Sequence, residues 1–134
     1  MKKYEVLEHK ADLKLRAFGK RKEELFSNML SAMVESQKAV TLPQKVKREF
    51  KIKSSDLPSL LVDFLSEVLY LSQVNKEIYK EVKFKKFTEN KIEGELTGQK
   101  VESFGQDIKA VTYHDLDVHQ QKHGLWQATI LFDI

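Results

Sequence analysis

The N-terminal part of the chain shows two hydrophobic periods in succession, which predict two strands and then a helix. Residues 4–8 and 13–18 alternate apolar with polar positions, as half-buried strands do, and a short polar turn at 9–12 separates them. From residue 22 to about residue 37 the apolar positions follow i, i+3, i+4 spacing, which predicts an amphipathic helix. These positions are Leu25, Phe26, Met29, Leu30 and Met33.

A further strand and a second helix are predicted in the middle of the chain. Residues 45–53 alternate strictly between apolar and basic positions. Ser55-Asp56-Leu57-Pro58 then has the pattern of a helix start, because a side chain that can cap the helix precedes an early proline that needs no amide partner. The helix should end near Ser72. Its apolar positions cover more than a narrow stripe, so we expect it to be the most buried element.

The C-terminal half has the pattern of antiparallel β structure. The predicted strands are 78–87, 91–98, 108–119 and 125–133, and a loop at 120–124 joins the last two. Strands with two inserted helices and no regular βαβ alternation predict an α+β fold, in which two amphipathic helices cover a mainly antiparallel sheet. No repeat or linker interrupts the chain, so we expect a single domain over residues 1–134.

Two aspartates lie at the ends of predicted strands, on their polar faces. Asp12 lies on the polar side of strand 13–18. Unless a bulge intervenes, we expect Asp133 to point away from the wholly apolar face of the last strand, which carries Trp126, Ala128, Ile130, Phe132 and Ile134. If the two carboxylates met, they could hold a hard divalent cation, and the terminal carboxylate of Ile134 could add an oxygen. The alternative is that His9 to Asp12 forms only a local turn.

Composition narrows the chemistry further. The chain has 134 residues and no cysteine, which excludes disulfides, cysteine nucleophiles and thiolate metal sites. No glycine-rich phosphate loop, paired-histidine helix or Gly-x-Ser-x-Gly elbow supports a common enzyme class. The longest runs without a charge, 25–34 and 123–132, are about half of the ~20 residues that a membrane-spanning helix needs. We therefore expect no membrane association, and a cytoplasmic location is the default.

Basic residues and histidines offer two further patterns. The lysine-rich strand 45–53 and the segment 78–91, where lysines alternate with aromatic residues, resemble a surface for single-stranded RNA. The alternative is a solvated sheet face with phenylalanines in the core. His114, His119 and His123 gather near the last hairpin, where they form either a two-histidine site or a set of exposed loop residues.

Several segments in order resemble the archease family. The resemblance is carried by Leu7-Glu8-His9-Lys10-Ala11-Asp12, by Lys109-Ala110-Val111-Thr112-Tyr113-His114 and by Phe132-Asp133-Ile134, together with residues 17–20, 23–26 and 56–71. The chain departs from the family's pattern at Lys10, where threonine is common. It also lacks a Gly-Glu and an Arg-His ahead of residue 109, because Gly98-Gln99 and a short segment stand there.

This resemblance implies a function and a site. Archeases act as cofactors of the RtcB-type RNA ligase, so the resemblance implies that the chain promotes guanylylation and repeated turnover of that ligase in tRNA splicing and RNA repair, without being an enzyme itself. It implies a divalent metal, such as calcium, manganese or magnesium, at Asp12 and Asp133. The resemblance also implies that the chain contacts RNA or tRNA through the ligase.

Four residues near this site are candidate contacts to the ligase or to a phosphate. Lys109 and Tyr113 alternate onto one strand face, and by cross-strand parity we expect that face to carry Asp133. His9 and His114 are the other two candidates.

Two other classes of function compete with the ligase cofactor. One is a general RNA-binding or chaperone-like module that uses the basic and aromatic sheet face. The other is a metal-dependent hydrolase, for which His9 would be the only evident general base.

Overall fold

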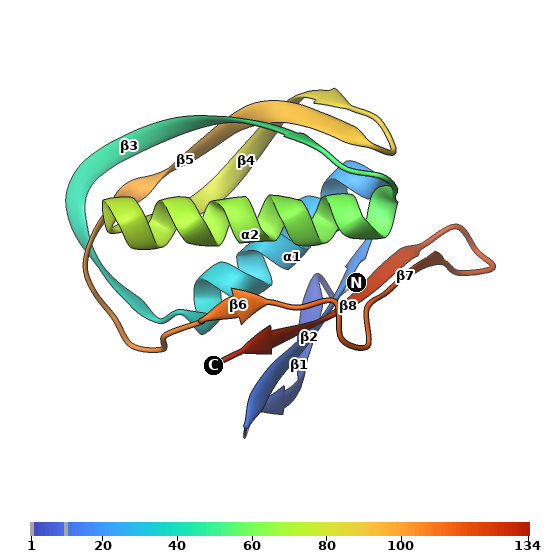
Figure 1. Ribbon diagram of the computed structural model, residues 1–134, viewed down its shortest axis with the longest axis horizontal. Coiled ribbons are helices and arrows are strands. Elements are labelled where there is room, and N and C mark those ends of the chain that lie inside the picture. Colours follow the sequence, from blue (N-terminus) through green and yellow to red (C-terminus); the bar gives the residue numbers. More distant parts are fainter. Residues whose placement is uncertain (1, 10) are drawn as a thin grey trace.

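The computed structural model describes residues 2–9 and 11–134, with the backbone alone at residue 9 (Figure 1). Its elements, in chain order, are β1 (Tyr4–His9), β2 (Asp12–Gly19), α1 (Lys22–Ser36), β3 (Ala39–Lys53), α2 (Leu57–Asn75), β4 (Glu77–Phe87), β5 (Lys91–Phe104), β6 (Ala110–Val111), β7 (Asp117–Gln120) and β8 (Trp126–Asp133).

The strands form two antiparallel sheets. The first has the order β1-β2-β8-β6, with β7 also paired to β8, and the second has the order β3-β5-β4. Figure 1 shows the second sheet arching over one side of α2, with β1, β2 and β8 on the other side. Each helix contacts strands of both sheets. The predicted α+β class is confirmed, with two sheets in place of one.

The core fills the space between the sheets. Leu13, Leu15 and Ala17 of β2 are buried, as are the inward residues of β8: Ala128, Ile130 and Phe132. Three phenylalanines of the second sheet pack with one from each helix, and neighbouring ring centroids lie 4.9–6.3 Å apart: Phe50, Phe84 and Phe87 with Phe26 and Phe64. One hydrophobic core thus joins both sheets and both helices.

Helix α2 is the more apolar of the two helices, but the prediction that it is the most buried element is wrong, because 9 of its 19 residues are buried against 8 of the 15 residues of α1. Helix α2 is long and apolar enough to cross a membrane by length and composition, but nine of its residues are buried inside the protein. The predicted start is confirmed, because the Asp56 carboxylate accepts a hydrogen bond from the Ser59 amide at 2.8 Å. That hydrogen bond lowers the pKa of Asp56. The helix ends at Asn75, a turn later than predicted, where Lys76 adopts a left-handed conformation with φ of 53°.

The predicted strand over 108–119 is wrong. Residues 112–116 form a loop between β6 and β7, in which Asp115 has a φ of 56°. The loop leaves the sheet where both the amide and the hydroxyl of Thr112 bond to the carbonyl oxygen of Leu131, at 3.0 and 2.9 Å. Strands β3 and β5 are longer than predicted, because pairing between them continues to Ala39 opposite Phe104.

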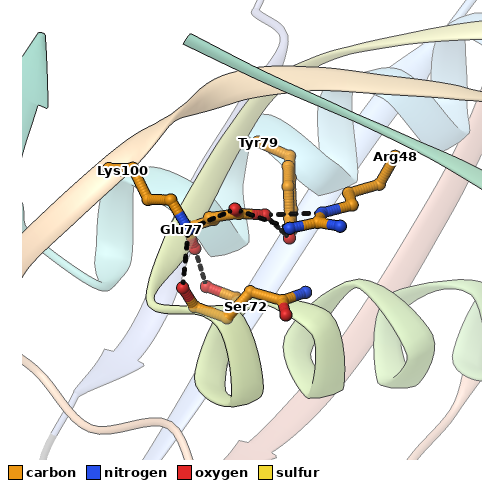
Figure 2. A network of polar contacts seen from close by, with 6 residues as sticks. Arg48, Ser72, Glu77, Tyr79 and Lys100 are labelled. Atoms are coloured by element: carbon orange, nitrogen blue, oxygen red, sulfur yellow. Dashed lines mark hydrogen bonds and ion pairs between the residues drawn. The ribbon is translucent and has the colours of Figure 1, made fainter. Parts of the chain in front are cut away.

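A buried glutamate connects the second sheet to the end of α2 (Figure 2). The Glu77 side chain is 0% exposed and accepts two hydrogen bonds from Arg48 of β3, at 2.9 and 2.8 Å. Lys100 of β5 lies 2.9 Å away, and the Tyr79 hydroxyl donates at 2.6 Å. The Ser72 hydroxyl donates to the backbone carbonyl of Glu77. One carboxylate thus links three strands, while its main chain is tied to the helix.

The electrostatics of this network favour an ionised Glu77. Hydrogen bonding to Arg48, reinforced by Tyr79 and Lys100, lowers the pKa of Glu77 to about 2 against the opposing effect of burial. Burial and the bond to Glu77 raise the pKa of Tyr79 to about 12. The sequence gives little sign of the network, because Arg48 resembles one more basic residue in a lysine-rich strand.

We predict that Glu77→Gln destabilises the fold by about 2 to 3 kcal/mol in chemical denaturation, because it leaves the cations that meet at this position unpaired. The cost should fall below that of a fully buried pair, since the Arg48 and Lys100 side chains are 40% and 41% exposed. Glu95→Gln on the same sheet is the control. Its pair with Lys47, at 3.9 Å, is solvent-accessible and should be worth less than about 1 kcal/mol. Equal effects of the two variants would contradict this account.

The same network predicts a dependence of stability on pH. Because the pKa of Glu77 is lowered from 4.5 to about 2 on folding, the unfolded chain binds more protons in this window. The contribution of Glu77 is therefore complete above about pH 4.5 and is lost as the pH falls towards 2. Denaturation midpoints across this window should fall less steeply in Glu77→Gln than in the wild type. Parallel curves would show that Glu77 does not titrate as inferred.

Candidate metal centre

The two predicted aspartates lie directly opposite each other. Asp12 is the first residue of β2 and Asp133 the last of β8, and the antiparallel register pairs them. Residues paired in this way project to the same face, with Cβ atoms about 4.5–5.5 Å apart. Their neighbours Leu13 and Phe132 are paired on the buried face, whereas both aspartates are exposed. The predicted outward direction of Asp133 is confirmed.

Strand β6 fixes the main chain of Asp133 from the other side. Ala110 pairs with Asp133, and the amide of Lys109 donates to the Asp133 carbonyl oxygen at 2.7 Å. The end of β8 is thus paired with β2 on one side and with β6 on the other. This pairing fixes the main chain of Asp133, although its side chain is exposed.

The charges at this edge are unbalanced. Two carboxylates directly opposite in a sheet repel each other. Among the described residues, no lysine, arginine or histidine forms an ion pair with either Asp12 or Asp133. Lys14, two residues from Asp12, instead lies 3.9 Å from the carboxylate of Asp115. The sequence did not single out Asp115, because its position depends on the loop over 112–116.

The donor set suits a hard divalent ion. Carboxylate oxygens are the ligands that calcium, magnesium and manganese prefer. The part of the chain that the structure describes contains no group of three or more His, Cys, Asp or Glu side chains placed to hold a metal. If Asp12 and Asp133 hold an ion, oxygens from Ile134, water or a partner would have to complete its coordination. The side chain of His9 lies outside the described residues.

The structure does not bring Lys109, Tyr113 and His114 together on one strand face, as the sequence predicted for Lys109 and Tyr113. Lys109 is exposed, but the register puts Ala110 on the face of Asp133, so the parity argument for Lys109 is wrong. The loop after β6 removes Tyr113 from the strand, and its hydroxyl bonds to Asp63 of α2 at 3.0 Å. This bond raises the pKa of Tyr113. His114 is 74% exposed and lies 3.7 Å from Asp115.

The other histidines do not assemble a site. His119 Nδ1 lies 2.9 Å from the carboxylate of Asp117, and both side chains are about half exposed. His123 is exposed in the β7–β8 turn. The structure favours exposed residues over a two-histidine site, with His119 in strand β7 and His123 in the following turn.

We predict that calcium or manganese binding, measured by titration calorimetry, weakens at least about tenfold in Asp12→Asn and in Asp133→Asn. In the presence of a chelator the same variants should be as stable as the wild type or slightly more stable, because each removes a like-charge pair. Asp117→Asn, an exposed aspartate of β7, is the control and should bind as the wild type does. Wild-type affinity in both site variants would rule out this centre.

Comparisons with known proteins show which family this chain resembles. The model of the archease protein family matches residues 4–134. Protein archease of Methanosarcina barkeri is 37% identical over 145 residues, covering 99% of this chain and 97% of the relative. Protein archease of Pyrococcus abyssi is 31% identical over 142 residues and covers both chains completely.

Solved structures show the same fold. The solution structure of protein 1598 of Methanobacterium thermoautotrophicum superposes with a TM-score of 0.70 at 26% identity over the whole of both chains. The crystal structure of an archease from Thermotoga maritima gives a TM-score of 0.68 at 19% identity, with 96% of this chain and 94% of that chain covered. The family model and the full-length relatives together show that this chain belongs to the archease family.

Proposed function

We propose that this protein is a non-catalytic activator of an RtcB-type RNA ligase. It would promote guanylylation of the ligase and allow repeated turnover in tRNA splicing and RNA repair, in the cytoplasm. Membership of the archease family supports the proposal. The structural observation that carries it is the opposed, exposed pair of Asp12 and Asp133 at the ends of the neighbouring strands β2 and β8.

The open position of this pair suits action on another macromolecule. Asp12 and Asp133 are exposed, and the cavity of about 400 Å³ between α1, β3 and β4 contains neither of them. A divalent ion held by the two carboxylates would neutralise negative charge on a transferring phosphoryl group. The chain's own part is to hold the two carboxylates together, with the Lys109 amide fixing the main chain of Asp133.

We further propose that Lys109, Tyr113, His114 and His9 contact the ligase or a phosphate. Lys109 adjoins the β6–β8 pairing and has an exposed side chain, while Tyr113 is 57% exposed beside α2. His114 is exposed in the same loop. His9 completes the proposed set. Ile134 is proposed as an additional oxygen ligand of the metal.

We predict that the protein accelerates transfer of labelled guanylate from GTP to the ligase of the same organism in the presence of manganese. Asp12→Asn and Asp133→Asn should lose most of this acceleration, at least about tenfold, because the phosphoryl group would then lack the bound cation. Lys109→Met should leave metal affinity unchanged and slow the activation, because it removes the charge and keeps the aliphatic stem.

Asp117→Asn serves again as the matched control and should activate as the wild type does. No acceleration at stoichiometric excess of the wild-type protein would contradict the proposed function. Full activation by Lys109→Met would remove Lys109 from the set of contacts while leaving the metal centre in place.

A further inference from the structure

The outer face of the β3–β5–β4 sheet is strongly basic. The outward positions of these strands carry eight lysines, which we call the lysine face: Lys45, Lys47, Lys51, Lys53, Lys83, Lys85, Lys86 and Lys91. Four glutamates lie on the same face: Glu49, Glu81, Glu93 and Glu95. The face therefore has a balance of +4, whereas the whole chain carries +3. All of the excess positive charge is concentrated on this one surface.

The aromatic residues of these strands are directed away from this face. Phe50, Phe84 and Phe87 are buried or half-buried, and their rings pack with Phe26 of α1 and Phe64 of α2. The bulges in β4 preserve this separation, since Phe84 pairs with Gly94 while Lys83 and Lys86 pair with the outward residues Glu95 and Glu93. The expected basic and aromatic surface for single-stranded RNA is thus basic only, because its rings belong to the core.

Five of the eight lysines of the face form no ion pair among the described residues: Lys45, Lys51, Lys53, Lys83 and Lys86. Lys47, Lys85 and Lys91 lie 3.9, 3.6 and 3.4 Å from glutamates of the face. Within the described part of the chain, Lys51, Lys53 and Lys86 form no ion pair and are exposed. Lys51 and Lys86 lie on either side of Glu93 in the register, and Lys53 pairs with Lys91. Positive charge therefore crosses all three strands at the end of the sheet near the β4–β5 turn.

We propose that the lysine face binds the phosphate backbone of base-paired RNA. Alternate residues of a strand lie about 6.6–6.8 Å apart and neighbouring strands about 4.8 Å apart, so the face presents rows of ammonium groups. Such groups neutralise phosphates without reading sequence. Binding of single strands additionally uses aromatic rings on which bases stack, and this face presents none among its described residues. A paired, structured RNA is the ligand that needs the backbone contacts alone.

A protein partner fits this face less well. Protein interfaces have an apolar, aromatic-rich centre and are depleted in lysine and glutamate. The large exposed apolar side chains of the described chain are Val6, Leu7, Val40, Tyr70, Val74 and Tyr113. Of these, Val40 alone belongs to the three strands, and it lies at the start of β3, before the first lysine of the face. Charge complementarity without apolar contact is characteristic of a nucleic-acid backbone.

The lysine face and the aspartate pair belong to different sheets. In Figure 1, the β3–β5–β4 sheet and the end of β8 lie on opposite sides of α2. The proposed function supplies the reason that structured RNA is present, because the ligase acts on tRNA. Binding to the lysine face is otherwise independent of the metal centre, so the two proposals can fail separately.

We predict that the full-length protein binds a duplex RNA of about 16 base pairs at least as tightly as a single strand of the same length in fluorescence anisotropy at low salt. Combined Lys51→Gln, Lys53→Gln and Lys86→Gln should weaken duplex binding about tenfold or more. It should also lower the slope of log affinity against log salt by about 2 to 3, because up to three phosphate contacts are lost. Combined Lys3→Gln, Lys20→Gln and Lys122→Gln changes the net charge equally at exposed positions outside the face, and should have little effect.

Equal loss of affinity in the two triple variants would overturn the proposal, since net charge alone would then explain binding. Tighter binding of the single strand, or equal binding of polyglutamate, would also overturn it. The metal variants Asp12→Asn and Asp133→Asn should keep wild-type RNA affinity. The lysine-face variant should keep RNA-free guanylylation of the ligase, which separates a failure of this proposal from a failure of the proposed function.

Discussion

The antiparallel pairing of β2 with β8 is the constraint on which both the core and the candidate metal centre depend. It brings the first and last parts of the chain together, with Leu13 opposite Phe132 and Leu15 opposite Ile130 on the buried face. The same register places Asp12 opposite Asp133 on the exposed face. A shift by one residue would turn the apolar side chains outwards, so the free energy of core packing also holds the two carboxylates together despite their repulsion.

The second sheet depends on a different kind of restraint. Its strands pack phenylalanines against both helices, and the buried carboxylate of Glu77 connects Arg48 and Lys100 from the two strands that accompany β4. Because the inward face is occupied by rings and by this network, the lysines are left on the outer face. The separation of apolar and charged positions along each strand thus produces a basic surface on the second sheet. This sheet and the end of β8 lie on opposite sides of α2 (Figure 1).

Periodicity in the sequence predicts most of the elements but not their partners. The alternation around Leu13 and before Asp133 is enough to place both aspartates on polar faces, yet no periodic signal states that β2 pairs with β8. Lys109 shows where this kind of prediction fails. Counting along a continuous strand places Lys109 on the same sheet face as Asp133, but the loop at 112–116 interrupts the strand, and Ala110 lies opposite Asp133. The role of Arg48 could not be predicted for a related reason, because its partner Glu77 is distant in sequence and belongs to another strand. The family resemblance supplied what periodicity could not, since it joined Asp12 and Asp133 in one site.

The central claim is that the β2–β8 register creates a divalent cation site from Asp12 and Asp133. Anomalous diffraction from crystals of the wild-type protein soaked with manganese tests it most directly, because manganese scatters anomalously and binds carboxylate oxygens. We predict a peak within coordination distance of both carboxylates. A peak at another group of side chains, or Asp12 and Asp133 resolved side by side with no ion between them at saturating manganese, would contradict it.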